Sequence, residues 1–202
     1  MPLTTQSSLS ADELDDLIYH ARTGDLVALR STISNLSALH SSTPSQIINT
    51  AIDSEPEEPS SGSGCCLLHW PAANGNQEVL KYLLSLLDIN ADEAEGAAGA
   101  LTSLVDHKNN SGNTPLHWAA VNAHLSCVQA LIAAGADPAV TNSAGHDALY
   151  EADCSSKDGG QEVAQWILAN CPGLEKAMKS EAGGRESVSE KEEDVDDSAN
   201  DQ

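Results

Sequence analysis

The chain has 202 residues, and its 31 Asp and Glu against 9 Lys and Arg give a formal net charge of −22. A field of that sign repels phosphate backbones, which argues against DNA or RNA as a direct ligand, and it attracts basic proteins. No apolar run approaches the roughly 18 residues that a membrane-spanning helix needs, and the polar, acidic start MPLTTQSSLSADELDD does not resemble a signal peptide.

The side chains available for a core are mostly small and aliphatic. The chain has three Trp, three Tyr and no Phe, so Leu, Ile, Val and Ala must fill the interior, which favours thin stacked helix pairs over one thick core. The five cysteines are odd in number and only two of them are neighbours. We therefore expect reduced thiols in an intracellular protein.

Two helices are predicted near the start of the chain, after a flexible segment over residues 1–10. Apolar residues at helical spacing precede Gly24, where the first helix should end, and Leu29 and Ile33 continue the pattern beyond it. This helix pair is placed within residues 11–53. Residues 54–63 (SEPEEPSSGS) are rich in Pro, Ser, Gly and Glu, so we expect a mobile loop there.

A first well-defined unit begins at Gly64 with the segment GCCLLHWPAANG, and an apolar stripe from Val79 to Leu84 predicts its second helix. Pro71 would lie inside the first helix. A proline there costs about 3 kcal/mol because it removes a hydrogen bond, so we expect this helix to be kinked or frayed at its start. An insertion that contains a short helix is expected within residues 88–106.

A second unit begins at Gly112 and is more regular. Thr114 can cap a helix, and Pro115 suits the first helical turn, where an N–H would lack a partner. An apolar stripe from Cys127 to Ile132 predicts a second helix. The next unit opens at Gly145, 33 residues after Gly112. This period, with a TPLH box at its start, resembles the ankyrin repeat.

The resemblance implies an all-α ankyrin solenoid of about four stacked helix pairs, with hairpins that project between the pairs. Residues 11–53 would form the N-terminal capping repeat. Residues 64–179 would hold the two firm repeats, the insertion and a degenerate C-terminal repeat that opens at Gly145. Residues 180–202 are acidic and nearly free of apolar side chains, so we expect a disordered tail.

Nothing in the sequence indicates catalysis, a metal ion or a cofactor. No H-E-x-x-H, C-x-x-C or G-x-S-x-G motif occurs. His69 and His117 stand at the histidine of the ankyrin box, which usually hydrogen-bonds within the repeat, so we interpret both as structural. Cys65 and Cys66 occupy a helix start, where a thiol pKa can fall. Burial as small apolar residues is the favoured interpretation, and a redox enzyme built on this pair is the disfavoured one.

The predicted function is to hold another protein on the concave face of the array. Trp70 and Trp118 recur directly after the two histidines. They either pack in the core or offer an aromatic pair to a partner, because Trp is enriched in interface hot spots. In ankyrin proteins, first helices and hairpin tips line this face. The residues assigned to it are Trp70, Ala73, Asn74, Asn110, Ser111, Asn113, Trp118, Val121, Asn122, His146, Asp147 and Glu151.

A closer resemblance rests on three segments: LIYHARTGDLVALR, NNSGNTPLHWAAVNAHLSCVQALI and NSAGHDALYEA. With the insertion and the acidic tail, they are similar to the Yar-type fungal ankyrin chaperones. The resemblance implies a protein, monomeric when free, that shields the basic KH-domain protein numbered three of the small ribosomal subunit until it joins the pre-40S particle, in cytoplasm and nucleus. The alternative is a general ankyrin adaptor or inhibitor that sequesters another signalling or nuclear protein.

Overall fold

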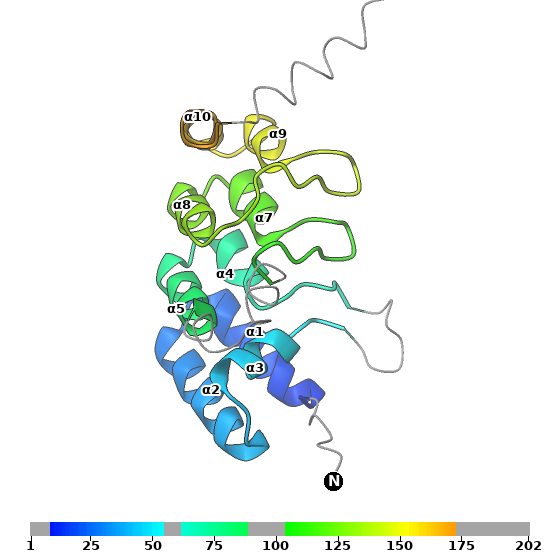
Figure 1. Cartoon of the computed structure of the whole chain (residues 1–202), viewed down its shortest axis with the longest axis vertical. Helices are drawn as coiled ribbons and strands as arrows, with labels where there is room; N and C mark the ends of the chain where they lie inside the picture. The colour runs from blue at the N-terminus through cyan, green and yellow to red at the C-terminus, as the bar shows by residue number, and fades with distance from the viewer. Residues whose placement is uncertain (1–8, 55–61, 89–103, 173–202) are drawn as a thin grey trace, which may run out of the picture.

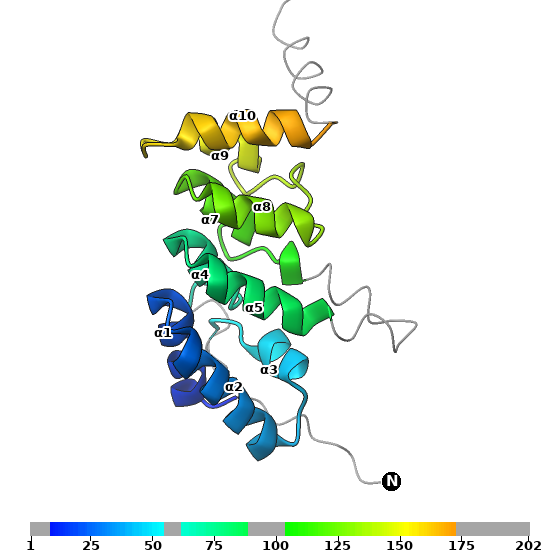
Figure 2. The same cartoon turned by 90° about the vertical axis from the view of Figure 1, so that its left-hand side faces the viewer.

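The computed structural model describes residues 9–54, 62–88 and 104–172, and the helices in these ranges form two stacked layers (Figure 1). The predictions for the flexible start, most of the loop, most of the insertion and the acidic tail fall on residues 1–8, 55–61, 89–103 and 173–202, outside the described residues. The inner layer contains α1 (Ala11–Thr23), α4 (His69–Asn74), α7 (Pro115–Val121) and α9 (Ala148–Asp153). The outer layer, which faces the viewer in Figure 2, contains α2 (Leu26–His40), α5 (Gln77–Asp88), α8 (Leu125–Ala133) and α10 (Gly160–Asn170).

The first helix pair, α1 and α2, has well-defined ends. Ser10 and Glu13 form a reciprocal capping box at the start of α1, in which the Glu13 carboxylate accepts from the Ser10 backbone N–H at 2.7 Å. Gly24 ends α1 with a φ of 80°, a left-handed conformation that costs glycine little. Asp25 then caps α2 by accepting from the Ala28 N–H at 2.9 Å. The two helices therefore form an antiparallel pair with a short connection.

A third helix in this region, α3 (Pro44–Thr50), did not emerge from the apolar spacing of the sequence. Its start carries a capping box made by Thr43 and Gln46, with Pro44 in the first turn. Ile47 and Ile48 are buried, and α3 packs between α2 and α5. The Thr-Pro-Ser-Gln sequence is the signal that could have predicted this helix, since it combines a cap, an N-terminal proline and a glutamine three residues after the cap.

The helix that contains Pro71 begins later than its counterpart. α4 starts at His69, whereas α7 starts two residues before the equivalent His117. Pro71 thus lies in the first turn, where its missing N–H would have no helical partner in any case. The expectation that this helix is frayed at its start is therefore confirmed, whereas the penalty for a proline in the helix interior does not apply, because the shifted start accommodates the proline.

One continuous core of aliphatic residues extends through the remaining helix pairs, which are α4 with α5, α7 with α8, and α9 with α10. Leu116, Leu131 and Ile167 are fully buried. Leu104 and Val105, which the sequence assigned to the insertion, also belong to this core. The prediction of an all-α ankyrin solenoid is confirmed. No helix among the described residues is long and apolar enough to span a bilayer.

Candidate partner-binding face

Two buried histidines link inner helices to the hairpin that follows them. His69 Nε2–H donates to the Asn113 carbonyl (2.9 Å), and in the next repeat His117 Nε2–H donates to the His146 carbonyl (3.0 Å). The Nδ1 atom of His117 accepts from the Thr114 backbone N–H (3.2 Å), which fixes the neutral tautomer. Burial lowers the pKa of both rings, to about 4 for His69. Both histidines are therefore neutral framework groups.

The adjacent cysteines are protonated at neutral pH. Cys66 Sγ lies 3.2 Å from His69 Nδ1 and donates to it, in the place that Thr114 takes in the next repeat. Burial raises the pKa of the Cys66 thiol to about 12 and also raises that of Cys65. A helix start would have to lower these pKa values to activate a thiol, so the redox interpretation lacks support. Within residues 9–54, 62–88 and 104–172, no group of three His, Cys, Asp or Glu side chains is placed to hold a metal ion.

The two tryptophans of the inner helices pack against each other. The rings of Trp70 on α4 and Trp118 on α7 meet edge to face, with centroids 5.9 Å apart at an angle of 87°. Both side chains are half-buried, so they contribute to packing and also remain accessible. They line a groove of about 380 Å³, here called the tryptophan groove. Its lining residues are Arg22, Trp70, Ala73, Asn74, Trp118, Val121 and Asn122.

Six of the twelve residues assigned to the docking face thus meet in the tryptophan groove. The two asparagines in this groove are held alike: Asn74 Nδ2 donates to the Trp70 carbonyl and Asn122 Nδ2 to the Trp118 carbonyl, each at 2.9 Å. Each amide is therefore fixed to the last turn of its helix, and its Oδ1 atom is left as an acceptor. The apolar lining of the groove comes from the two indole rings together with Ala73 and Val121.

Arg22 also lines this groove, although the sequence pattern did not predict it. Gly24 and Gly75 end their helices alike, both in the left-handed conformation, so Arg22 occupies in α1 the position of Ala73 in α4. Thr23 repeats the asparagine contact there, since its hydroxyl donates to a carbonyl four residues earlier at 2.8 Å. Alignment of the capping helix on these glycines would have placed Arg22 on the same face.

Three further assigned residues meet at the hairpin before α9. Asn142 Nδ2 donates to Asn113 Oδ1 (2.8 Å) and to Glu151 Oε1 (2.9 Å), and His146 Nδ1 lies 3.2 Å from the same carboxylate oxygen. The His146 ring also stacks on Tyr150, with centroids 3.9 Å apart. Asn142 holds this network together and was not predicted, because its role depends on two partners from different elements.

The last three assigned residues have local structural roles. Asp147 caps α9 by accepting from the Tyr150 N–H at 2.8 Å. Asn110 is exposed at a hairpin, where its Nδ2 donates to the Gly62 carbonyl (2.9 Å). The carbonyl of Ser111, also exposed, accepts from the Ser143 N–H at 3.1 Å. Neighbouring hairpins are thus tied to one another along the array. All twelve residues remain predicted contact residues.

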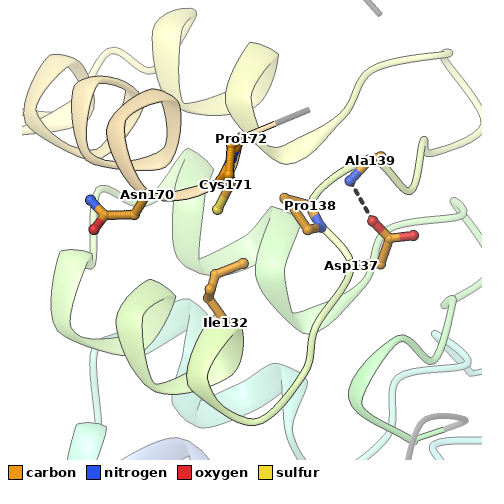
Figure 3. A pocket seen from close by; sticks show the side chains of 7 residues that line it. All are labelled: Ile132, Asp137, Pro138, Ala139, Asn170, Cys171 and Pro172. Carbon is orange, nitrogen blue, oxygen red and sulfur yellow. Dashed lines mark hydrogen bonds between the residues drawn. The ribbon is translucent and has the colours of Figure 1, made fainter. Parts of the chain in front are cut away.

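A second hollow, of about 360 Å³, lies away from this face (Figure 3). Ile132, Pro138 and Cys171 supply much of its apolar lining, between the end of α8 and the end of α10. Its charged group, the Asp137 carboxylate, accepts from the Ala139 N–H at 2.9 Å and so serves the local turn. None of the residues assigned to the docking face lies in it.

Stacked helix pairs, histidine links to the hairpins and an aromatic groove define a repeat protein whose inner face suits the binding of another protein. A family model described as "Ankyrin repeats (3 copies)" matches residues 16–142 and 93–179. The ankyrin repeat-containing protein YAR1 of Saccharomyces cerevisiae is 34% identical over 161 residues, which cover 79% of this chain and 70% of that protein. The chain therefore belongs to the ankyrin-repeat family and, within it, to the group that contains Yar1, which confirms the resemblance found in the sequence.

A solved structure and two enzymes add to this comparison. A chain in the crystal structure of the yeast ribosomal protein Rps3 in complex with its chaperone Yar1 matches with a TM-score of 0.66 and 33% identity, over 80% of this chain and 94% of that one. The palmitoyltransferase AKR1 of Kluyveromyces lactis is 30% identical over 155 residues, and Hip14 of Drosophila melanogaster is 35% identical over 84. This chain spans only 17% and 11% of the length of those two enzymes, so the matches concern a small part of each.

Proposed function

We propose that this protein is a dedicated chaperone that binds and shields a newly made basic small-subunit ribosomal protein, the KH-domain protein numbered three, and keeps it soluble until it joins the pre-40S particle. The observation that carries this proposal is the structural match to the complex of Rps3 with its chaperone Yar1, which extends over 94% of the matched chain. A match of that extent includes the whole stack of repeats, whereas the matches to palmitoyltransferases cover a small fraction of each enzyme.

Electrostatics supports the same client. A ribosomal protein outside the ribosome exposes the basic surface that normally contacts RNA, and a chain with a net charge of −22 attracts that surface and accelerates the encounter. Charge alone would accept many basic partners. The tryptophan groove adds shape, because its paired rings offer an apolar surface of fixed geometry at which contacts can select one client.

The proposal includes binding without catalysis, and residence in both cytoplasm and nucleus. The two histidines of the repeat boxes are neutral and hydrogen-bonded to the framework, and the Cys66 thiol is protonated, so these groups suit stability better than reactivity. A client made in the cytoplasm and assembled into pre-40S particles in the nucleus would require its chaperone in both places.

Co-expression with yeast Rps3, followed by affinity purification, tests the function. We expect Rps3 to co-purify with this chain and to become more soluble, and binding to weaken between about 0.1 and 0.5 M salt because long-range attraction is screened. If Rps3 neither co-purifies nor gains solubility, the chaperone proposal is wrong. If it binds with the same affinity across that range of salt, attraction by net charge does not contribute.

A matched pair of tryptophan variants tests whether the groove is the docking surface. Trp118→Ala removes a ring from the groove, and loss of a hot-spot residue typically costs at least about 2 kcal/mol of binding, or about 30-fold in Kd. Trp166→Ala on the outer helix α10 is the control, because Trp166 is also half-buried and its carbonyl accepts from an asparagine four residues later at 2.9 Å. Equal losses of Rps3 binding in the two variants would argue against the groove.

A further inference from the structure

The tryptophan groove contains a cation although the protein is strongly acidic. Arg22 lies in the last turn of α1 and lines the groove, and it forms no ion pair with any carboxylate among the described residues. Two other basic side chains are engaged elsewhere: Arg30 lies over the Tyr82 ring, 4.6 Å from its centroid, and Lys108 Nζ donates to the Thr141 carbonyl at 2.8 Å. Arg22 is thus a guanidinium in the groove without an anionic partner in the described part of the chain.

A second donor in the same groove also lacks a partner. The Trp70 Nε1 atom is inaccessible to solvent and has no hydrogen-bond acceptor among the described residues. A buried donor without an acceptor is costly, and native structures rarely keep one without a reason. The inaccessible Trp70 N–H is not open to a client, whereas Arg22 is exposed and offers its guanidinium to an acceptor that enters the groove.

We propose that the tryptophan groove receives a client segment in which an apolar side chain packs on the rings of Trp70 and Trp118 and a neighbouring acidic side chain pairs with Arg22. This inference rests on the proposed function, since it concerns how the client docks. A guanidinium binds a carboxylate through two parallel hydrogen bonds, which fixes direction as well as distance. The acidic surface of the chaperone would draw in any basic protein, and Arg22 would select the register of the bound segment.

A purely structural role for Arg22 predicts a different result. A cation in the last turn of α1 interacts favourably with the helix dipole, which affects the stability of the free protein and leaves client binding unchanged. General charge attraction predicts yet another result, because Arg22→Glu makes the protein more acidic and should strengthen the binding of a basic client. The proposed contact predicts weaker binding, so the sign of the effect separates the three explanations.

The experiment compares Arg22→Glu with Lys81→Glu, a matched reversal of charge at an exposed residue of the outer helix α5. The probe is purified yeast Rps3, and its Kd is measured by calorimetry at about 0.1 M salt, after thermal unfolding has shown that both variants are folded. We expect Arg22→Glu to weaken binding at least about tenfold, and Lys81→Glu to leave it unchanged or to strengthen it. Arg22→Gln should lie between wild type and Arg22→Glu.

Three results would overturn the inference while leaving the proposed function intact. These are wild-type affinity in Arg22→Glu, tighter binding in Arg22→Glu, and equal weakening in Lys81→Glu. Absence of Rps3 binding by the wild-type protein would instead refute the proposed function itself.

A second experiment locates the carboxylate of Rps3 that pairs with Arg22. Single Asp or Glu to Lys reversals in Rps3 are tested for binding to the Arg22→Glu variant. We expect one reversal to restore binding; if none does, the acceptor is not an acidic side chain and the proposal fails.

Discussion

The buried histidine of the first firm repeat should make the stability of this protein depend on pH. His69 is inaccessible to solvent, and burial lowers its pKa from 6.5 to about 4. Between about pH 7.5 and pH 5, the unfolded chain therefore takes up a proton at this ring and the folded chain does not. Stability rises with pH wherever the unfolded state binds more protons, so acidification destabilises the fold. The two pKa values give a loss of about 2 kcal/mol over this interval.

His69→Gln isolates this contribution, because glutamine can still donate a hydrogen bond and does not titrate in this range. Urea unfolding of both proteins at about pH 7.5 and pH 5 yields two pH-dependent losses of stability. The wild-type loss should exceed the loss in the variant by about 2 kcal/mol, while the other histidines and the net charge contribute equally to both.

Proton NMR of the folded protein gives an independent measurement of the same pKa. The ring Cε1–H resonance of His69 should keep its neutral shift down to about pH 5, and its assignment follows from its absence in His69→Gln. A titration midpoint near 6.5 would refute the argument from burial. Equal pH dependence of stability in wild type and variant would refute it as well.

Three other predictions concern backbone strain, thiol reactivity and local stability. Gly75→Ala should lower the free energy of unfolding by about 1 kcal/mol more than Gly145→Ala. Both glycines have a positive φ, but only at Gly75 would a new Cβ collide with a neighbouring ring, 2.7 Å from His124 Nδ1; equal losses in urea unfolding would contradict this. A thiol reagent should label exposed Cys154 at the rate of an unhindered thiol and should label Cys66 only after unfolding, because Cys66 is buried and burial raises its pKa to about 12. Amide hydrogens of α4 should exchange faster than those of α7 because α4 begins two residues later, and slower exchange in α4 would count against this.

The features that the sequence predicted correctly depend on local spacing. The 33-residue period, the TPLH box and the apolar stripes repeat within single helix pairs, so they identify the ankyrin solenoid without knowledge of tertiary contacts. The same repeat geometry brought six of the assigned residues, Trp70 and Trp118 among them, into one groove. Position within a repeat is therefore sufficient to predict which side chains share a face.

The features that were missed depend on contacts between distant segments. Arg22 joins the groove because α1 stacks on α4, and Asn142 matters because it bridges Asn113 and Glu151. α4 starts two residues later than α7 relative to the histidine of its box, which places Pro71 in the first turn. Helix propensities alone do not predict which of two possible residues begins a helix. The helix α3 is the exception, since its capping box was present in the sequence.

The charge of the protein and the geometry of its inner face act on different steps of binding. Attraction by a net charge of −22 operates over a Debye length of about 10 Å at 0.1 M salt, so it accelerates the encounter and does not distinguish basic proteins from one another. The edge-to-face pair of Trp70 and Trp118 acts only after contact, and changes at such a site usually alter the dissociation rate. Salt should therefore change mainly the association rate of the client and Trp118→Ala mainly its dissociation rate. The exposed Arg22 would act in the second step as well, against the sign of the overall field, so the selective contacts of this protein can be separated experimentally from its attractive charge.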